Sequence, residues 1–181
     1  MSDDCNCGNK PPPEPSRCWP NDPDYLDGKT EIELPPERFT KVFWDADILD
    51  LDDKNKNDTI LGTDELFKVR FRIELRGRLW RCITGDWKFD VGFTPIGREG
   101  AFLLSSLLPS DPNFGYPNWR GCDTLCIERI VTVPPGTIKL QEGEDTVVFE
   151  TAAKVELRCC DGHIAVAGYE ALEEYQFFRG A

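Results

Sequence analysis

The feature that most constrains this chain is segment 67–76, FKVRFRIELR, in which apolar and charged residues alternate without a break. Side chains of a β-strand point alternately to its two faces, so this period of two predicts a strand with one buried face. The pattern recurs at Trp87, Phe89, Val91 and Phe93. Two such segments near the middle of the chain indicate a sheet.

Further strands are predicted where apolar and aromatic residues gather between turns rich in Gly, Pro and Asp, such as Pro134-Pro135-Gly136. These strands are expected at 39–44, 101–107, 125–133, 147–157, 164–167 and 175–178. Residues 170–175 have an alternative interpretation as a short helical turn. About eight strands separated by turns predict an all-β fold, an antiparallel two-sheet β-sandwich that is jelly-roll-like.

Residues 1–30 are expected to form an extended N-terminal arm, and residues 31–181 the β-sandwich domain. The run Pro11-Pro12-Pro13-Glu14-Pro15 favours polyproline II and lacks most of its amide donors. The arm nevertheless carries Trp19 and Tyr25, which a purely solvated tail would not need. An arm of this length can reach across its own domain or onto a neighbouring subunit.

The net charge of −12 argues against nucleic acid as a partner, because phosphate binding needs clustered Lys and Arg. No stretch approaches the ~20 apolar residues that a membrane-spanning helix needs, so we expect no membrane insertion. The first five residues, Met1 to Cys5, are polar and acidic, unlike a signal peptide. We therefore expect synthesis in the cytoplasm, with an extracellular or surface location left open after assembly.

Three of the eight cysteines, Cys5, Cys7 and Cys18, lie on the arm. In an oxidising place such exposed cysteines can bond to a neighbouring chain, which makes them candidates for disulfides between subunits. The sequence does not fix the pairing, because eight cysteines allow ~105 complete connectivities.

Charge is unevenly distributed along the chain. Lys68, Arg70, Arg72 and Arg76 share the outward face of the 67–76 strand, whereas aspartates crowd segment 45–58. A basic face and an acidic face on one molecule favour head-to-tail contact between copies. The alternative is a solvated strand face whose charges prevent edge aggregation. The interface candidates are Trp19, Tyr25, Lys68, Arg70, Arg72 and Arg76.

A cysteine-bearing arm with Cys5-x-Cys7, followed by a sandwich, resembles in design the disulfide-stitched jelly-roll subunits of bacterial spore appendages. The resemblance implies a structural, self-assembling subunit of filament, appendage or coat type. It also implies a homo-oligomer or polymer held together by the arm and its cysteines.

We expect no enzymatic activity. The chain has no G-x-S-x-G, no H-E-x-x-H and no phosphate-binding glycine loop. Its one histidine, His163, follows Cys160 without an orienting partner that the sequence identifies.

Two groups of residues are candidate metal ligands, and no other cofactor is expected. The first resembles part of an EF-hand loop, with oxygen ligands for calcium at alternate positions: Asp53, Asn55, Asn57, Thr59 and Asp64. Its alternative is a solvated acidic turn. The second has soft ligands for zinc, with core thiols or disulfides as its alternative: Cys122, Cys126, Cys159, Cys160 and His163.

The alternative function is a carbohydrate-binding or other ligand-binding β-sandwich module, stabilised by calcium. A glycan would stack on exposed aromatic rings. The rings in question are Trp19, Trp80, Trp87, Tyr116 and Trp119. For Trp87 we favour packing in the core, because it alternates with Phe89 and Val91.

Overall fold

The alternating 67–76 segment forms strand β4 (Phe67–Arg76), whose apolar residues are all buried. Arg72 and Glu74, on the opposite face of the same strand, are also buried. The computed structural model describes residues 18–19, 29–32, 41–50, 59–77, 80, 83–159 and 162–180. Within these residues no helix is long and apolar enough to cross a membrane.

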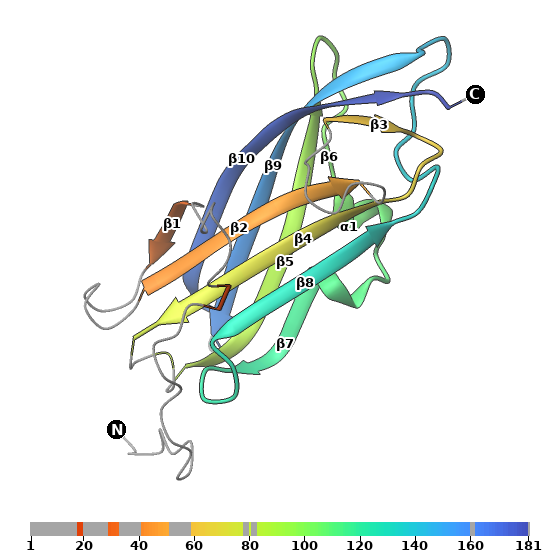
Figure 1. The fold of residues 1–181 in the computed structure, drawn as a ribbon. Helices are drawn as coiled ribbons and strands as arrows, with labels where there is room; N and C mark the ends of the chain where they lie inside the picture. The colour runs from red at the N-terminus through yellow and green to blue at the C-terminus, as the bar shows by residue number, and fades with distance from the viewer. Residues whose placement is uncertain are drawn as a thin grey trace.

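Two sheets pack face to face, and Figure 1 shows the smaller one in front of the larger. The smaller sheet has the order β2-β4-β8, and the larger has the order β1-β10-β9-β5-β6, with β7 on β5 and β3 on β10. The bounds not yet given are β1 Lys29–Ile32, β2 Lys41–Asp50, β3 Ile60–Gly62, β5 Thr84–Pro95, β6 Phe102–Leu103, α1 Leu104–Leu107, η2 Pro112–Phe114, β7 Gly115–Arg120, β8 Cys126–Val133, β9 Thr146–Cys159 and β10 Ile164–Phe178.

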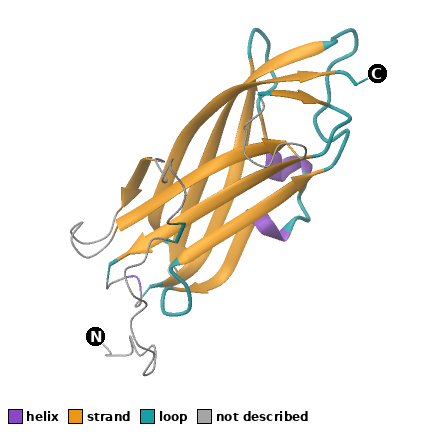
Figure 2. Cartoon of the chain, viewed as in Figure 1, coloured by secondary structure: helices purple, strands orange, loops and turns teal. Residues whose placement is uncertain are grey.

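The all-β, two-sheet sandwich is therefore confirmed, and Figure 2 shows how little of the chain is helical. All strand pairs are antiparallel except β3 with β10, which is parallel. The jelly-roll connection stays a prediction. β1 begins at Lys29, two residues before the expected domain boundary, and pairs with β10.

Three local predictions were wrong. Two strands at 164–167 and 175–178 were predicted, but residues 164–178 form the single strand β10. Its pairing with β9 shifts register between Ala171 and Glu174, and this irregularity is a bulge and not a helical turn. Of 101–107 only Phe102–Leu103 is strand, since the Asp90 carboxylate binds Ser105 and the chain turns into α1. Residues 115–120, for which no strand was predicted, form β7 by pairing with β5.

Aromatic rings fill the space between the sheets. Neighbouring ring centroids lie between 5.2 and 6.4 Å apart, in mostly tilted or edge-to-face pairs. The indole of Trp44 lies directly on the backbone of β10. A Cβ added at Gly168 would be 2.9 Å from that indole and 2.6 Å from Val155 Cγ2. Gly168 thus lets the two sheets approach closely.

Candidate functional site

A cavity of about 400 Å³ lies over the outer face of the large sheet, on the side away from the core. The strands β5 and β9 supply its charged residues, which alternate with buried core residues along each strand. The charged residues are Lys88, Asp90, Lys154 and Glu156. The remaining lining residues come from β5, β6, α1 and η2, and they are Phe89, Leu103, Ser105 and Phe114.

The Asp90 carboxylate holds one wall of this groove in place. One of its oxygens accepts the Val91 N–H at 2.9 Å and the Ser105 N–H at 3.1 Å. The other accepts the Ser105 hydroxyl. Leu103 lies above Gly92, where an added Cβ would be 3.7 Å from its methyl. The short β6–α1 segment is thereby fixed over β5.

The charges of the groove follow the strand register. Lys88 lies opposite Glu156, and Asp90 opposite Lys154. Glu156 forms ion pairs with Lys154 at 2.5 Å and with Arg158 at 3.0 Å. The hydrogen bond from Lys154 holds the pKa of Glu156 below its ordinary value, against the opposing effect of burial. Lys88 is exposed and makes no ion pair with any residue that the structure describes.

On the small sheet, basic residues of β4 form ion pairs with aspartates of β2 in the same chain. Arg70 pairs with Asp47 at 2.6 Å, and Arg72 donates to Asp45 at 3.0 Å, each across the β2–β4 register. Burial raises the pKa of Asp45, while Arg72 opposes that shift. For the described aspartates, Asp45 and Asp47, the expectation of separate basic and acidic faces was wrong, because antiparallel pairing places these opposite charges side by side.

The predicted interface residues of β4 accordingly differ in exposure. Arg72 is 4% exposed, so a neighbouring subunit cannot reach it as the chain is folded. Arg76 contacts Glu74 and lies over the Phe43 ring at 4.7 Å. Lys68 is half-buried opposite Leu49. Tyr25 lies outside the described residues.

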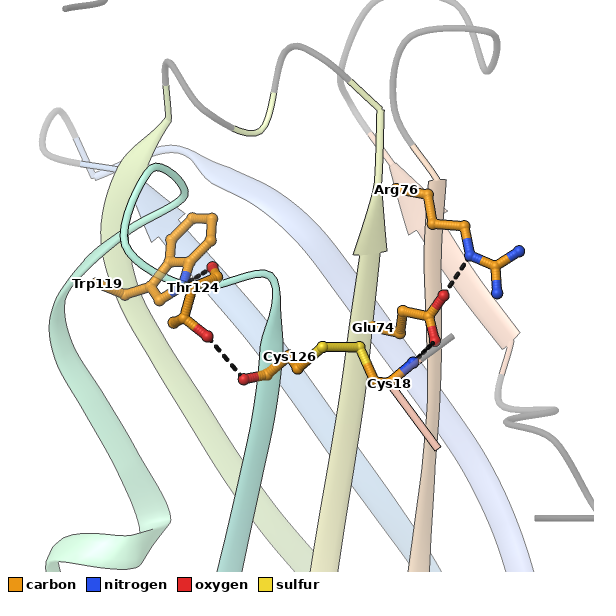
Figure 3. The surroundings of a disulfide bond; sticks show 6 residues. All are labelled: Cys18, Glu74, Arg76, Trp119, Thr124 and Cys126. Atoms are coloured by element: carbon orange, nitrogen blue, oxygen red, sulfur yellow. Dashed lines mark hydrogen bonds and ion pairs between the residues drawn. A yellow bond between two sulfur atoms is a disulfide. The ribbon is translucent and has the colours of Figure 1, made fainter. Parts of the chain in front are cut away.

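Cys18 forms a disulfide with Cys126 of the same chain, at the start of β8 (Figure 3). Its backbone N–H donates to a Glu74 carboxylate oxygen at 2.9 Å. The Cζ atom of Arg72 lies over the Trp19 ring, 5.7 Å from the ring centroid. This short segment thus lies on the outer face of the small sheet. Cys18 is therefore corrected from a bond between subunits to a bond within the chain. Cys5 and Cys7 lie outside the described residues.

The aromatic residues proposed for a glycan are mostly core residues. Trp80, Trp87 and Trp119 are at most 1% exposed and pack edge to face around Trp119. Tyr116 is half-buried under the Arg129 guanidinium, at 4.1 Å. The prediction of a sugar-stacking platform on these tryptophans was wrong, because their rings are buried in the core. Tyr169, 61% exposed on β10 opposite Lys154, is an exposed ring that sequence reasoning missed.

The candidate metal sites are only partly described. Asp53, Asn55 and Asn57 lie outside the described residues. Strand β3 lies inside this loop, between Thr59 and Asp64, and the described elements on either side of the loop are the strands β2 and β4 and not the helices of an EF-hand. Within the described part of the chain, no three Cys, His, Asp or Glu side chains are grouped to hold a metal ion.

The zinc set is broken by the disulfide, because Cys126 is bonded to Cys18. Cys122 is a free thiol, and both Cys122 and Cys159 are half-buried. His163 accepts the Cys159 N–H through its backbone carbonyl at 2.9 Å. Cys160 lies outside the described residues.

The groove was not found from the sequence because its residues come from four segments. In the sequence, Lys88 and Asp90 are recognisable only as polar positions of an alternating strand. The one available signal was that charged residues alternate with apolar ones on both β5 and β9.

A scan against models of known protein families found no match, and a search of curated proteins found none either. Among solved structures, the chain is similar to a Niemann-Pick type C2 protein from the Japanese carpenter ant, with 11% sequence identity and a TM-score of 0.39. The match covers 83% of this chain and 99% of that chain. At that TM-score it decides neither the family nor the function of this protein.

Proposed function

We propose that this β-sandwich is a ligand-binding domain whose site is the groove over β5 and β9. The observation that carries the proposal is a cavity of about 400 Å³ lined by both charged and apolar side chains. Small-molecule sites usually have volumes of ~300–1,000 Å³ and combine apolar walls with a few placed polar groups.

The packing between the sheets favours the outer face as the binding site. Phe93 lies against Phe102, Phe149 and Phe177 at 5.2 to 6.1 Å between ring centroids, and fully buried tryptophans fill the other end. A ligand between the sheets would have to displace these rings. The groove needs no such displacement.

The groove is also held in shape before any ligand arrives. Asp90 fixes the α1 wall through Ser105, and Lys154 on the floor is ion-paired with Glu156. A site that is already ordered loses less conformational entropy on binding. Leu103 and Phe114 then supply apolar contact.

The test is a binding screen on the full chain by two-dimensional NMR, with small organic acids, organic bases, neutral amphiphiles and oligosaccharides. We expect ligand-induced shifts to centre on the amides of Lys88, Ser105 and Lys154. Phe114→Ala should weaken binding, whereas Phe178→Ala, which removes an exposed ring elsewhere, should not. The proposal is wrong if no compound binds, or if the shifts lie on another face.

A second candidate function is self-assembly through the outer edge of β8, which pairs with β4 and with no other described strand. Leu75 N–H donates to Leu125 O, so by alternation the backbone groups of Ile130 and Thr132 point away from β4. Ile130 is 39% exposed at this edge. An unpaired edge with an apolar side chain is suited to pairing with a strand of another copy.

The edge of β2 differs, because side chains of β10 occupy it. Glu170 accepts the Ala46 N–H at 3.1 Å, and the Tyr175 hydroxyl bonds the Ile48 backbone.

Mass measurement under native conditions tests the β8 edge. If β8 drives assembly, Ile130→Lys should dissociate the assemblies, and Ile96→Lys, 48% exposed in a turn, should not. A monomeric wild-type chain would end this candidate.

A further inference from the structure

The groove of the proposed binding site offers hydrogen-bond donors but few free acceptors. Both oxygens of Asp90 are occupied, by two backbone N–H groups and by the Ser105 hydroxyl. Both oxygens of Glu156 are occupied, by Lys154 on one side and Arg158 on the other. A ligand that donates hydrogen bonds or carries a positive charge therefore has to share these oxygens with partners from the chain itself.

The donors are less fully used. Lys88 lines the groove, is exposed, and makes no ion pair or side-chain hydrogen bond within the part of the chain that the structure describes. Its ammonium group has three N–H donors and no acceptor. Lys154 has Glu156 as its carboxylate partner among the described residues, and two further N–H donors.

The charged residues that line the groove are equal in number. Two cations, Lys88 and Lys154, lie beside two carboxylates, Asp90 and Glu156. Of these four groups, the Lys88 ammonium is the one that makes no ion pair or side-chain hydrogen bond with a residue that the structure describes. An anion at Lys88 therefore gains a charge-assisted contact without displacing an existing one.

The walls of the groove favour a ligand that also has an apolar part. Leu103 is 50% exposed beside the groove, and Phe114 is half-buried in it. Covering them removes apolar surface from water and favours binding. The two lysines and the apolar wall line one cavity of about 400 Å³, which a small molecule can span.

From these features, and resting on the proposed ligand-binding function, we infer that the ligand of the groove is a small amphipathic anion. Its carboxylate, phosphate or sulfate group lies at Lys88, within reach of Lys154, and its apolar part lies against Leu103 and Phe114. The free ammonium of Lys88 is the group that selects the charge.

The experiment compares four probes of equal chain length by titration calorimetry on the full chain: octanoate, octyl phosphate, octanamide and octylammonium. We expect octanoate and octyl phosphate to bind at least about tenfold more tightly than octanamide or octylammonium, because a charge-assisted hydrogen bond contributes about that factor. The ratio of octanoate to octyl phosphate affinity distinguishes a carboxylate from a phosphate ligand.

Lys88→Gln should reduce octanoate affinity about tenfold, to the level of octanamide, and leave octanamide binding unchanged. Lys68→Gln is the matched control, because it removes the same charge from the outer face of the other sheet. Raising the salt concentration should weaken octanoate binding to the wild type and have little effect on octanamide.

The outcomes separate the two proposals. Equal binding of all four probes in the groove, unaffected by Lys88→Gln, would overturn the inferred anion and leave the binding function standing. If none of the four probes binds, the inferred class is also wrong. The broader screen over ligand classes then decides the binding function by itself.

Discussion

Cutting the bond between Cys18 and Cys126 tests how the N-terminal segment contributes to stability. Cys18→Ser removes the bond and keeps a side chain of similar size. The bond joins residues 108 positions apart, so it restrains much of the unfolded chain. Its loss should therefore lower the free energy of unfolding mainly by increasing the entropy of the unfolded state.

The chain-entropy relation gives about 5 kcal/mol for a loop of this size, and measured values are more often ~2–4 kcal/mol. The folded state loses contacts too. Glu74 is 2% exposed and accepts the Cys18 N–H, so release of the segment leaves this carboxylate with one partner fewer. We expect a total loss of about 3–5 kcal/mol.

The assay is urea unfolding of the full chain, followed by tryptophan fluorescence, with and without reductant. Cys18→Ser should lower the midpoint without reductant, and reduced wild type should unfold at the same midpoint as the variant. Cys122→Ser is the control, because Cys122 is a free, half-buried thiol. It should leave a stability difference between oxidised and reduced protein.

Two results would refute this reasoning. Reductant without effect on the wild-type midpoint would show that the bond does not stabilise the fold. An equal loss from Cys122→Ser, with the reductant effect abolished, would show that Cys122 and not Cys18 takes part in the bond.

Three other substitutions test the packing and charges of the sandwich. Trp119→Ala should cost about 3–5 kcal/mol in thermal unfolding, since the ring is fully buried, and an unchanged melting temperature would contradict that placement. Gly168→Ala should cost about 1–3 kcal/mol by overpacking, whereas Gly92→Ala, whose Cβ meets only ordinary contacts, should be tolerated; equal effects would contradict the close approach of the sheets. The lowered pKa of Glu156 stabilises the fold above the ordinary value of 4.5, and this stability is lost as pH falls through the folded pKa. Glu156→Gln should therefore reduce the loss of stability between about pH 5 and about pH 3, measured by urea midpoints; a variant with the wild-type slope would exclude this carboxylate as the cause.

The strands with regular alternation were predictable because the alternating pattern of each strand lies within a few consecutive residues. The 67–76 pattern alone places Val69, Phe71 and Ile73 on one face, and these residues are buried in the structure. The prediction failed where a distant partner decides the conformation. Ser105 leaves the sheet because Asp90, 15 residues earlier, binds it.

The candidate site depended still more on distant contacts. The sequence shows Lys88 and Lys154 only as polar positions in two strands, and only the β5–β9 register brings them to one groove. The same holds for Arg72, which looked like an exposed cation until its pairing with Asp45, 27 residues away, placed both in a buried ion pair.

The sequence by itself determined that this chain folds into sheets and which face of the regular strands is buried. The alternation of apolar and polar residues is a local property of the sequence. Burial of the apolar face stabilises such a strand in any pairing register that keeps this face toward the core. Only the tertiary structure decided that Cys18 bonds Cys126, that the tryptophans are covered, and that four segments form one groove. Those outcomes depend on which strands pair and in what register, and that choice is made by the packing of the whole core.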